Sequence, residues 1–98
     1  MDKIDIIKEL LSYMRANGGP DKSWYVGISQ YARKRLFTDH NVSKDQGIWI
    51  DLNADTDSIA REVEEFFIKQ VRTDGGPGGG DMAANTVYAY KKTPSTRP

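Results

Sequence analysis

The chain has 98 residues, enough for one small domain but too few for a dinucleotide-binding fold with a second domain. Its 14 basic side chains balance its 14 acidic ones, which excludes a globally basic nucleic-acid binder and confines any nucleic-acid contact to a local patch. The lack of cysteine excludes disulfides, thiolate zinc sites and cysteine nucleophiles. Because no apolar run reaches the roughly 20 residues of a membrane helix and acid stands where a signal peptide has base, the sequence predicts a cytoplasmic domain without membrane contact.

The first predicted element is an amphipathic helix over residues 1–16. Its apolar side chains follow the 3.6-residue period of a helix, with acids near its beginning and a base near its end. The stretch 17–20, Asn-Gly-Gly-Pro, ends it, because glycine permits a left-handed cap and proline cannot continue a helix. The predicted apolar stripe contains Ile4, Ile7, Leu10, Leu11 and Met14.

Two predicted strands and a short basic helix follow. The stretch 24–28, Trp-Tyr-Val-Gly-Ile, has the aromatic and β-branched composition of a strand, and its interior glycine indicates a bulge or a close backbone approach. Ser29 is the candidate cap of a short helix that runs to about Phe37. A polar loop over 39–47 then leads to the second strand, 48–52.

The second half of the chain contains the longest predicted helix and the last strand. The helix begins at a cap within 55–57 and ends near Val71. A glycine-rich stretch follows, which we interpret as a linker or a lid; its residues 75–80 are expected to move on the nanosecond timescale, because glycine has the most backbone freedom. The last strand spans 86–91, and residues 93–98 are expected to form a disordered tail.

Together these elements predict one α+β domain over residues 1–98, with a three-stranded sheet flanked by helices. One carboxylate stands out on the longest helix. On a helical wheel Glu64 falls between Val71 and Ile68, whereas Glu62 and Glu65 lie on the solvent side. An unpaired buried carboxylate is costly, so this position indicates a partner or a metal ion. The ordinary alternative is a glutamate at the margin of the apolar arc that reaches water or pairs with a nearby arginine.

Two further features admit both a functional and an ordinary interpretation. The run Arg33-Lys34-Arg35 can be a solvated face or a phosphate clamp, since guanidinium groups donate in a planar fork. His40, the single histidine, can be a solvated loop residue or a proton carrier, because the pKa of histidine lies near neutrality. Aromatic residues near the basic run would also suit contact with nucleic acid.

In their order and spacing, these residues resemble the GIY-YIG nuclease superfamily over about residues 23–71. The stretch 25–27, Tyr-Val-Gly, looks like the family's second signature strand, Tyr-Ile-Gly. Arg35 follows ten residues after the tyrosine and precedes a leucine, as does the family's catalytic arginine. Ala60 and Glu64 fit the helix motif Ala-x-x-x-Glu, whose glutamate binds a divalent cation, and this motif selects the same carboxylate as the helical wheel.

The family's first strand, Gly-Ile-Tyr, pairs with the Tyr-Ile-Gly strand, whereas here the residues before 24 are predicted to be helical. The stretch 87–90, Val-Tyr-Ala-Tyr, looks like this first strand moved to the other end of the chain. We therefore expect the strand at 88–91 to pair beside the strand at 25–28. His40 stands five residues after Arg35, where members of the family often have four.

The resemblance implies hydrolysis of phosphodiester bonds in nucleic acid, with DNA preferred to RNA. Glu64 would hold Mg²⁺ or Mn²⁺ weakly, and Arg35 would donate to the non-bridging phosphate oxygens. Tyr25, with His40 or a C-terminal tyrosine, would orient or deprotonate the attacking water. The substrate would also contact Arg33, Lys34, Asn85 (the counterpart of a late asparagine in the family) and Tyr88.

The alternative function is a non-catalytic interaction domain that keeps the same scaffold and binds a protein partner. The lack of a first signature strand, the neutral net charge and the small size favour this alternative, whereas the catalytic arginine and glutamate favour the enzyme. The sequence does not indicate an oligomeric state.

Overall fold

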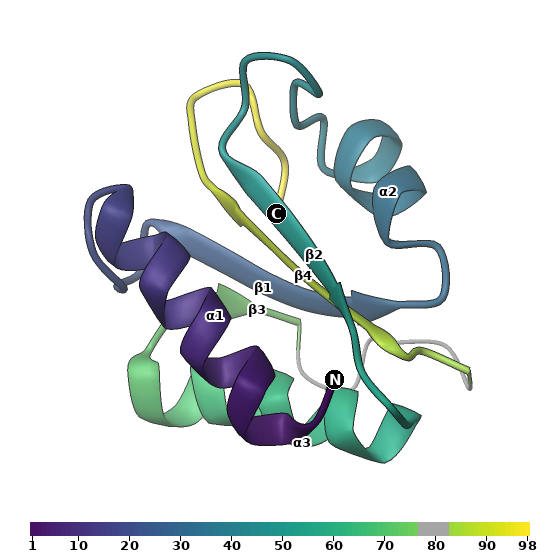
Figure 1. The fold of residues 1–98 in the computed structure, drawn as a ribbon. Helices are drawn as coiled ribbons and strands as arrows, with labels where there is room; N and C mark the ends of the chain where they lie inside the picture. The colour runs from purple at the N-terminus through teal and green to yellow at the C-terminus, as the bar shows by residue number, and fades with distance from the viewer. Residues whose placement is uncertain (77–82) are drawn as a thin grey trace.

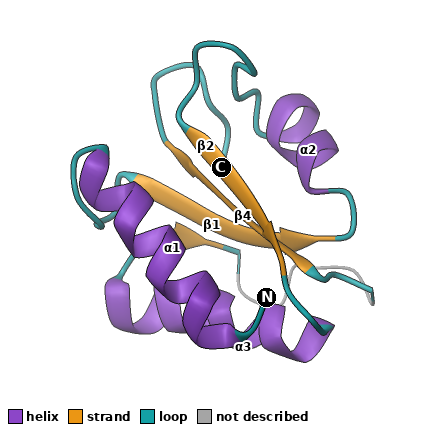
Figure 2. Cartoon of the chain, viewed as in Figure 1, coloured by secondary structure: helices purple, strands orange, loops and turns teal. Residues whose placement is uncertain are grey.

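The computed structural model describes residues 1–76 and 83–98. Helices alternate with strands along the chain up to the last two described strands, which follow one another (Figure 2). None of the described helices is long and apolar enough to cross a bilayer. Residues 77–80 of the glycine-rich stretch, and with them most of the expected mobile segment, lie outside the described residues. The elements are α1 (Lys3–Ala16), β1 (Trp24–Ser29), α2 (Ala32–Lys34), the π-helical segment η1 (Arg35–Asp39), β2 (Trp49–Asn53), α3 (Asp57–Phe66), the π-helical segment η2 (Phe67–Val71), β3 (Asp74–Gly75) and β4 (Thr86–Lys91).

The strands form one mixed sheet in the order β2-β4-β1-β3. The C-terminal strand β4 is antiparallel to both β1 and β2, with Tyr25 opposite Tyr90 and Gly27 opposite Tyr88. This register confirms the prediction that the last strand pairs beside the strand at 25–28. The α+β class is likewise confirmed.

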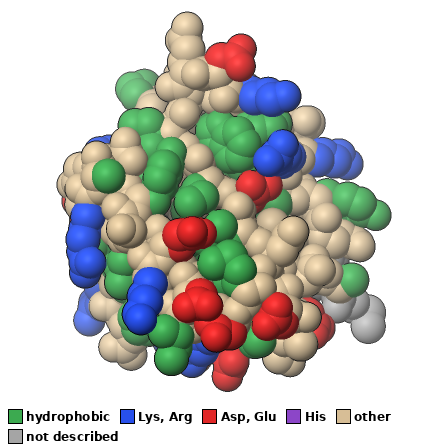
Figure 3. Space-filling view, in the orientation of Figure 1, with side chains coloured by type: hydrophobic (Ala, Val, Ile, Leu, Met, Phe, Trp, Pro, Cys, Tyr) green, Lys and Arg blue, Asp and Glu red, His purple; other side chains and the backbone are tan. Residues whose placement is uncertain are grey.

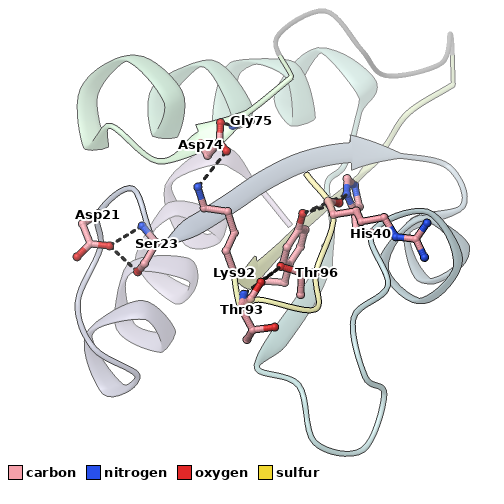
Figure 4. Close-up of polar contacts among 10 residues, drawn as sticks. Asp21, Ser23, His40, Asp74, Gly75, Lys92, Thr93 and Thr96 are labelled. Atoms are coloured by element: carbon pink, nitrogen blue, oxygen red, sulfur yellow. Dashed lines mark hydrogen bonds and ion pairs between the residues drawn. The ribbon is translucent and has the colours of Figure 1, made fainter.

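The prediction of three strands is wrong, because a fourth and very short strand, β3, runs parallel to β1. It begins two residues after Arg72, whose left-handed backbone (φ 70°) ends η2 and turns the chain back along the sheet. Its residues are Asp74 and Gly75, two types that strands disfavour, so composition gives no sign of it. Lys92, the residue after β4, bonds Asp74 at 3.0 Å and so links β3 to the end of β4 across β1 (Figure 4).

Helices cover both faces of the sheet (Figure 1). Successive strand residues point to opposite faces, so β1 contributes Trp24 and Val26 to the core beneath α1 and α3, and Tyr25 to the second cluster beneath α2. This second cluster is mainly aromatic, because β4 adds Tyr88 and Tyr90 to the same face. The sheet is therefore the middle layer of three, and its two faces have different chemistry.

Helix α1 packs on the sheet through a slightly different stripe from the predicted one. Its fully buried side chains are Ile6, Leu10 and Met14, whereas Ile4 is 62% exposed. The helix is thus rotated about its axis so that its i, i+4, i+8 row faces the core.

Acidic residues in the first turns of α1 and α3 agree with the helix dipole. Acidic side chains also gather in the lower part of the face shown in Figure 3.

Helix α3 begins at a side-chain cap, as predicted. Thr56 Oγ1 accepts a hydrogen bond of 3.1 Å from the backbone N–H of Ile59. Replacing Thr56 with alanine leaves that N–H without its partner and should cost about 1 kcal/mol. For a domain of this size the melting temperature should fall by roughly 4–8 °C. The control is Ser58→Ala in the first turn of the same helix; equal melting of the two variants would contradict a capping role for Thr56.

The short basic helix differs from its prediction in both its start and its form. Ser29 ends β1 rather than capping the helix directly, and its hydroxyl accepts from the backbone N–H of Tyr31 at 2.9 Å. The α-helical part covers only Ala32–Lys34, after which η1 widens into π geometry. The chain leaves η1 through a hydrogen bond of 2.8 Å from the N–H of His40 to the carbonyl of Arg35, a five-residue step.

The C-terminal tail is folded back onto the domain, in contrast to the predicted disordered tail. Thr93 and Thr96 close a turn through a backbone hydrogen bond of 3.1 Å and a side-chain bond of 3.0 Å (Figure 4). The amide of Asn41 donates to the carbonyl of Ser95 at 2.9 Å. Beyond this turn the N–H of Arg97 donates to the carbonyl of His40. Polar composition predicts solvation, but these long-range bonds order the segment.

Candidate active site

A cleft of about 170 Å³ opens at the β1 side of the sheet. The four predicted catalytic residues, Tyr25, Arg35, His40 and Glu64, all line it, and so does Tyr88, which was predicted to contact substrate. They come from β1, η1, the residue after η1, α3 and β4. Among the described residues β3 pairs with β1 only at Tyr25 and Val26. Beyond Val26 no described strand covers this side of β1, so the side chain of Glu64 can reach the cleft from α3, which lies on the other face of the sheet. The remaining lining residues are Gly27, Ile28 and Gly76.

Gly27 makes room for the tyrosine at the centre of the site. A Cβ atom at this position would lie 2.5 Å from both Cζ and Oη of Tyr88, far inside contact distance. The ring of Tyr88 therefore lies over the bare backbone of its cross-strand partner, an arrangement that covers an otherwise exposed glycine. Of the two expectations for this glycine, a bulge or a close approach to the backbone, the structure shows a close approach, made by the ring of Tyr88.

The π-helical geometry of η1 places His40 in the same cleft as Arg35. In an α-helix the residue four positions along returns to the same face, whereas the five-residue hydrogen bond of a π turn accommodates one residue more. The bond from the His40 N–H to the Arg35 carbonyl is of this kind. The five-residue spacing between Arg35 and His40 is therefore accommodated by the backbone. Arg35 itself is 39% exposed and pairs with Asp39 at 3.6 Å.

His40 is buried, at 7% exposure, and the interpretation of a solvated loop residue is therefore wrong. Both ring nitrogens have partners: Nε2 lies 2.8 Å from Tyr88 Oη, and Nδ1 lies 2.7 Å from the carbonyl of Arg97. Burial is the largest effect on this imidazole and lowers its pKa below 6.5, against the opposing effect of the Arg97 hydrogen bond. The ring is thus neutral at physiological pH.

Glu64 is the buried carboxylate that the helical wheel singles out, at 5% exposure. Burial raises the pKa of this side chain to about 7, and the charge of Arg61 opposes that rise without cancelling it. None of the ion pairs found within residues 1–76 and 83–98 includes Glu64. The cleft therefore contains a carboxylate whose negative charge is poorly compensated by the protein.

A divalent cation fits this carboxylate. Mg²⁺ is typically held by one or two carboxylates, with water and substrate phosphate oxygens completing its octahedral shell. The described residues contain no cluster of three potential metal ligands, so the protein would contribute Glu64 as its ligand and the substrate would supply more. The uncompensated charge of Glu64 is the feature that such an ion would neutralise.

Three tyrosines surround the imidazole. The ring of Tyr25 lies 4.7 Å from that of His40, 5.2 Å from that of Tyr90 and 6.5 Å from that of Tyr88. Burial raises the pKa of all three phenols, and the charge of Glu64 adds to this effect at Tyr25 and Tyr88. The phenols are therefore protonated at neutral pH and can donate hydrogen bonds.

Three of the residues predicted to contact substrate are not among those that line the cleft. Arg33 points toward β2, where it pairs with Asp51 at 3.1 Å and lies over the ring of Trp49. Lys34 is exposed and borders the same groove as Arg33. Asn85 is exposed, and its carbonyl accepts from Ala54 at 2.7 Å. The basic run is therefore divided: Arg35 lies at the cleft and its two neighbours lie elsewhere.

Sequence analysis included one group at this site only under the general description of a C-terminal tyrosine, and it missed a second group. Tyr90 lies two residues after Tyr88 on the same strand face, so the period-two rule could have found it. The carbonyl of Arg97 belongs to a segment predicted to be disordered, and a backbone acceptor leaves no signal in the sequence.

Comparison with family models, with curated proteins and with solved structures finds no match to this chain. The argument for a function therefore starts from the cleft itself.

Proposed function

We propose that this domain hydrolyses phosphodiester bonds in nucleic acid with the help of a divalent cation, as a GIY-YIG-like nuclease. The observation that supports the proposal is the meeting of Tyr25, Arg35, His40, Glu64 and Tyr88 in one cleft, although they are spread over most of the chain. A cation ligand, a phosphate-binding guanidinium and a hydrogen-bonded imidazole–phenol pair are the parts that such a reaction needs.

Arg35 has the exposure and the geometry to bind the scissile phosphate. Its side chain is 39% exposed at the cleft, and its guanidinium shares one loose ion pair, of 3.6 Å, with Asp39. A guanidinium donates to two oxygens in one plane, which suits the non-bridging oxygens of a phosphodiester. Arriving phosphate would compete with Asp39 for this group, so a strong new hydrogen bond replaces a weak one.

The Tyr88–His40 pair can activate the attacking water. Neutral His40 accepts the phenol proton of Tyr88 at Nε2, while the phenol oxygen takes a proton from water, so the proton lost by water ends on the imidazole and hydroxide attacks phosphorus. Tyr25, whose ring lies tilted against that of His40 at 4.7 Å, orients the water. Glu64 would hold the cation, which when bound supplies Lewis-acid stabilisation of charge on the phosphate and the leaving oxygen.

DNA is the first substrate to test and RNA the second, as the family resemblance implies. The rival function, a non-catalytic interaction domain, is favoured by two observations: the cleft is small, about 170 Å³, and the described residues provide no cluster of three metal ligands. The two functions differ in whether the protein cleaves at all.

Nicking of supercoiled plasmid DNA in Mg²⁺ or Mn²⁺, with chelator as the blank, tests the proposal. We expect metal-dependent nicking that falls by at least about 10²-fold in Arg35→Ala and in Glu64→Gln, the size of effect expected for one charge-stabilising group. Glu62→Gln, on the solvent face of the same helix, is the matched control and should cleave like the parent. Equal nicking by the parent and Glu64→Gln, or none by the parent in either metal, would favour the interaction domain.

A further inference from the structure

The last residues of the chain contact the buried His40 at Nδ1, whereas the other ring nitrogen, Nε2, faces Tyr88 in the cleft. Arg97 uses only its backbone here: its N–H donates to the His40 carbonyl at 2.8 Å, and its carbonyl lies 2.7 Å from His40 Nδ1. The turn formed by Thr93 and Thr96 and the bond from Asn41 to Ser95 hold the tail in place. The segment therefore presents one backbone carbonyl to one ring nitrogen.

These contacts determine where the imidazole carries its proton. A carbonyl oxygen can only accept a hydrogen bond, so at 2.7 Å from it Nδ1 must be the donor. A neutral imidazole has a single N–H, which leaves Nε2 as an acceptor. Tyr88 Oη, 2.8 Å from Nε2, must then be the donor of the second bond. The Arg97 carbonyl therefore fixes which atom is the donor in both hydrogen bonds of the imidazole.

Tyr90 agrees with this assignment. Its hydroxyl lies 3.2 Å from the Arg97 carbonyl and 3.1 Å from His40 Nδ1. Its one proton goes to the carbonyl, and its oxygen then faces the N–H of the ring. The opposite assignment, with the phenol donating to Nδ1, would leave that nitrogen and the carbonyl at 2.7 Å without a proton between them.

We propose that the backbone carbonyl of Arg97 is a positioning group that fixes His40 as the Nδ1–H tautomer, so that Nε2 is free to take the proton of Tyr88. This inference rests on the proposed nuclease function for its consequence, but the tautomer itself does not depend on it. The C-terminal tail is then part of the catalytic apparatus although it lies outside the cleft lining. With the other tautomer, Nε2 would carry a proton and could not accept one.

The chain has a single histidine, which permits a direct test. Long-range ¹H–¹⁵N spectra at pH 8 separate the two ring nitrogens, because a protonated and an unprotonated nitrogen differ widely in ¹⁵N shift. We expect the Nδ1–H pattern in the full chain, in Arg97→Ala, which keeps the carbonyl, and in Tyr90→Phe. We expect loss of this single pattern in a chain that ends at Thr96. Melting temperatures verify that each variant is folded.

The plasmid assay measures the consequence. In the chain that ends at Thr96, kcat should fall by about 10²-fold, the lower range for general acid–base catalysis, with KM within about 2-fold because Arg35 is untouched. Glu62→Gln, on the solvent face of α3, should cleave like the parent. An Nε2–H pattern in the full chain, or an unchanged pattern after truncation, overturns the inference, and a pattern lost in Tyr90→Phe assigns the role to Tyr90 instead. If the parent shows the Nδ1–H pattern but never cleaves, the nuclease function fails and the tautomer assignment stands as a structural one.

Discussion

Replacing Gly27 with alanine is expected to lower the melting temperature by roughly 4–24 °C, because overpacking of a filled site costs about 1–3 kcal/mol and each kcal/mol shifts the midpoint of a small domain by 4–8 °C. The added methyl would lie 2.5 Å from Cζ and Oη of Tyr88. This ring cannot simply turn aside, since it is only 3% exposed and its hydroxyl is bonded to His40. Relief of the clash must therefore move the ring and break that bond.

Thermal melting of four variants measures the effect: Gly27→Ala, Gly76→Ala, Tyr88→Ala and the double variant of Gly27 and Tyr88. Gly76→Ala is the matched control at the same cleft, where a Cβ would come no closer than 3.2 Å to the hydroxyl of Tyr25. In the background of Tyr88→Ala the substitution at Gly27 should cost far less than in the parent, because the clashing ring is gone; the difference between the two costs is the coupling energy. Equal costs in both backgrounds would show that the strain lies in the strand backbone and not in the Gly27–Tyr88 contact.

Hydrophobic periodicity predicts most of this fold because burial follows it. The strands β1, β2 and β4 and the helix α1 lie close to their expected bounds, since each presents an apolar face of clear period. The longest predicted helix reaches Val71 only when the π-helical segment η2 is counted together with α3, which ends at Phe66. The short strand β3 has no such face. Its place beside β1 depends on the turn at Arg72 and on the bond between Lys92 and Asp74, neither of which has a local signal.

The site was most predictable at Glu64, which the helical wheel and the Ala-x-x-x-Glu motif both select. The helical wheel already singles it out, because an ionisable group among apolar neighbours is costly. His40 does not stand out, since a polar loop predicts exposure. Its burial depends on the π turn of η1 and on the docked tail, both of which are set by tertiary contacts. The basic run does not act as one unit, because helix residues two positions apart point in different directions, so Arg33 and Arg35 do not face one site.

Replacing Glu64 with glutamine is expected to stabilise the metal-free protein at pH 8 and to leave it nearly unchanged at pH 4.5. Burial raises the pKa of this carboxyl from 4.5 to about 7 in the folded protein, so the folded state binds the proton more tightly than the unfolded state does. The stability of the parent therefore falls as pH rises from 4.5 to 7 and levels off above that range. The difference between these pKa values corresponds to about 3 kcal/mol of lost stability at pH 8, which glutamine does not lose.

Melting of the parent and Glu64→Gln across pH 4.5–8 in chelator checks this expectation. The neutral side chain should melt roughly 12–24 °C higher than the parent at pH 8, and the gap should close as pH falls. His40, whose pKa is lowered by burial, contributes a pH dependence of the opposite sign, but it is present in both proteins and cancels in the comparison. Glu62→Gln, on the solvent face, controls for the loss of one charge.

Mg²⁺ should raise the melting temperature of the parent at pH 8 but not that of Glu64→Gln, because only an ionised carboxylate binds the cation. A glutamine variant that melts below the parent at pH 8 in chelator would mean that Glu64 is held by a basic partner, and the case for it as a cation ligand would be lost.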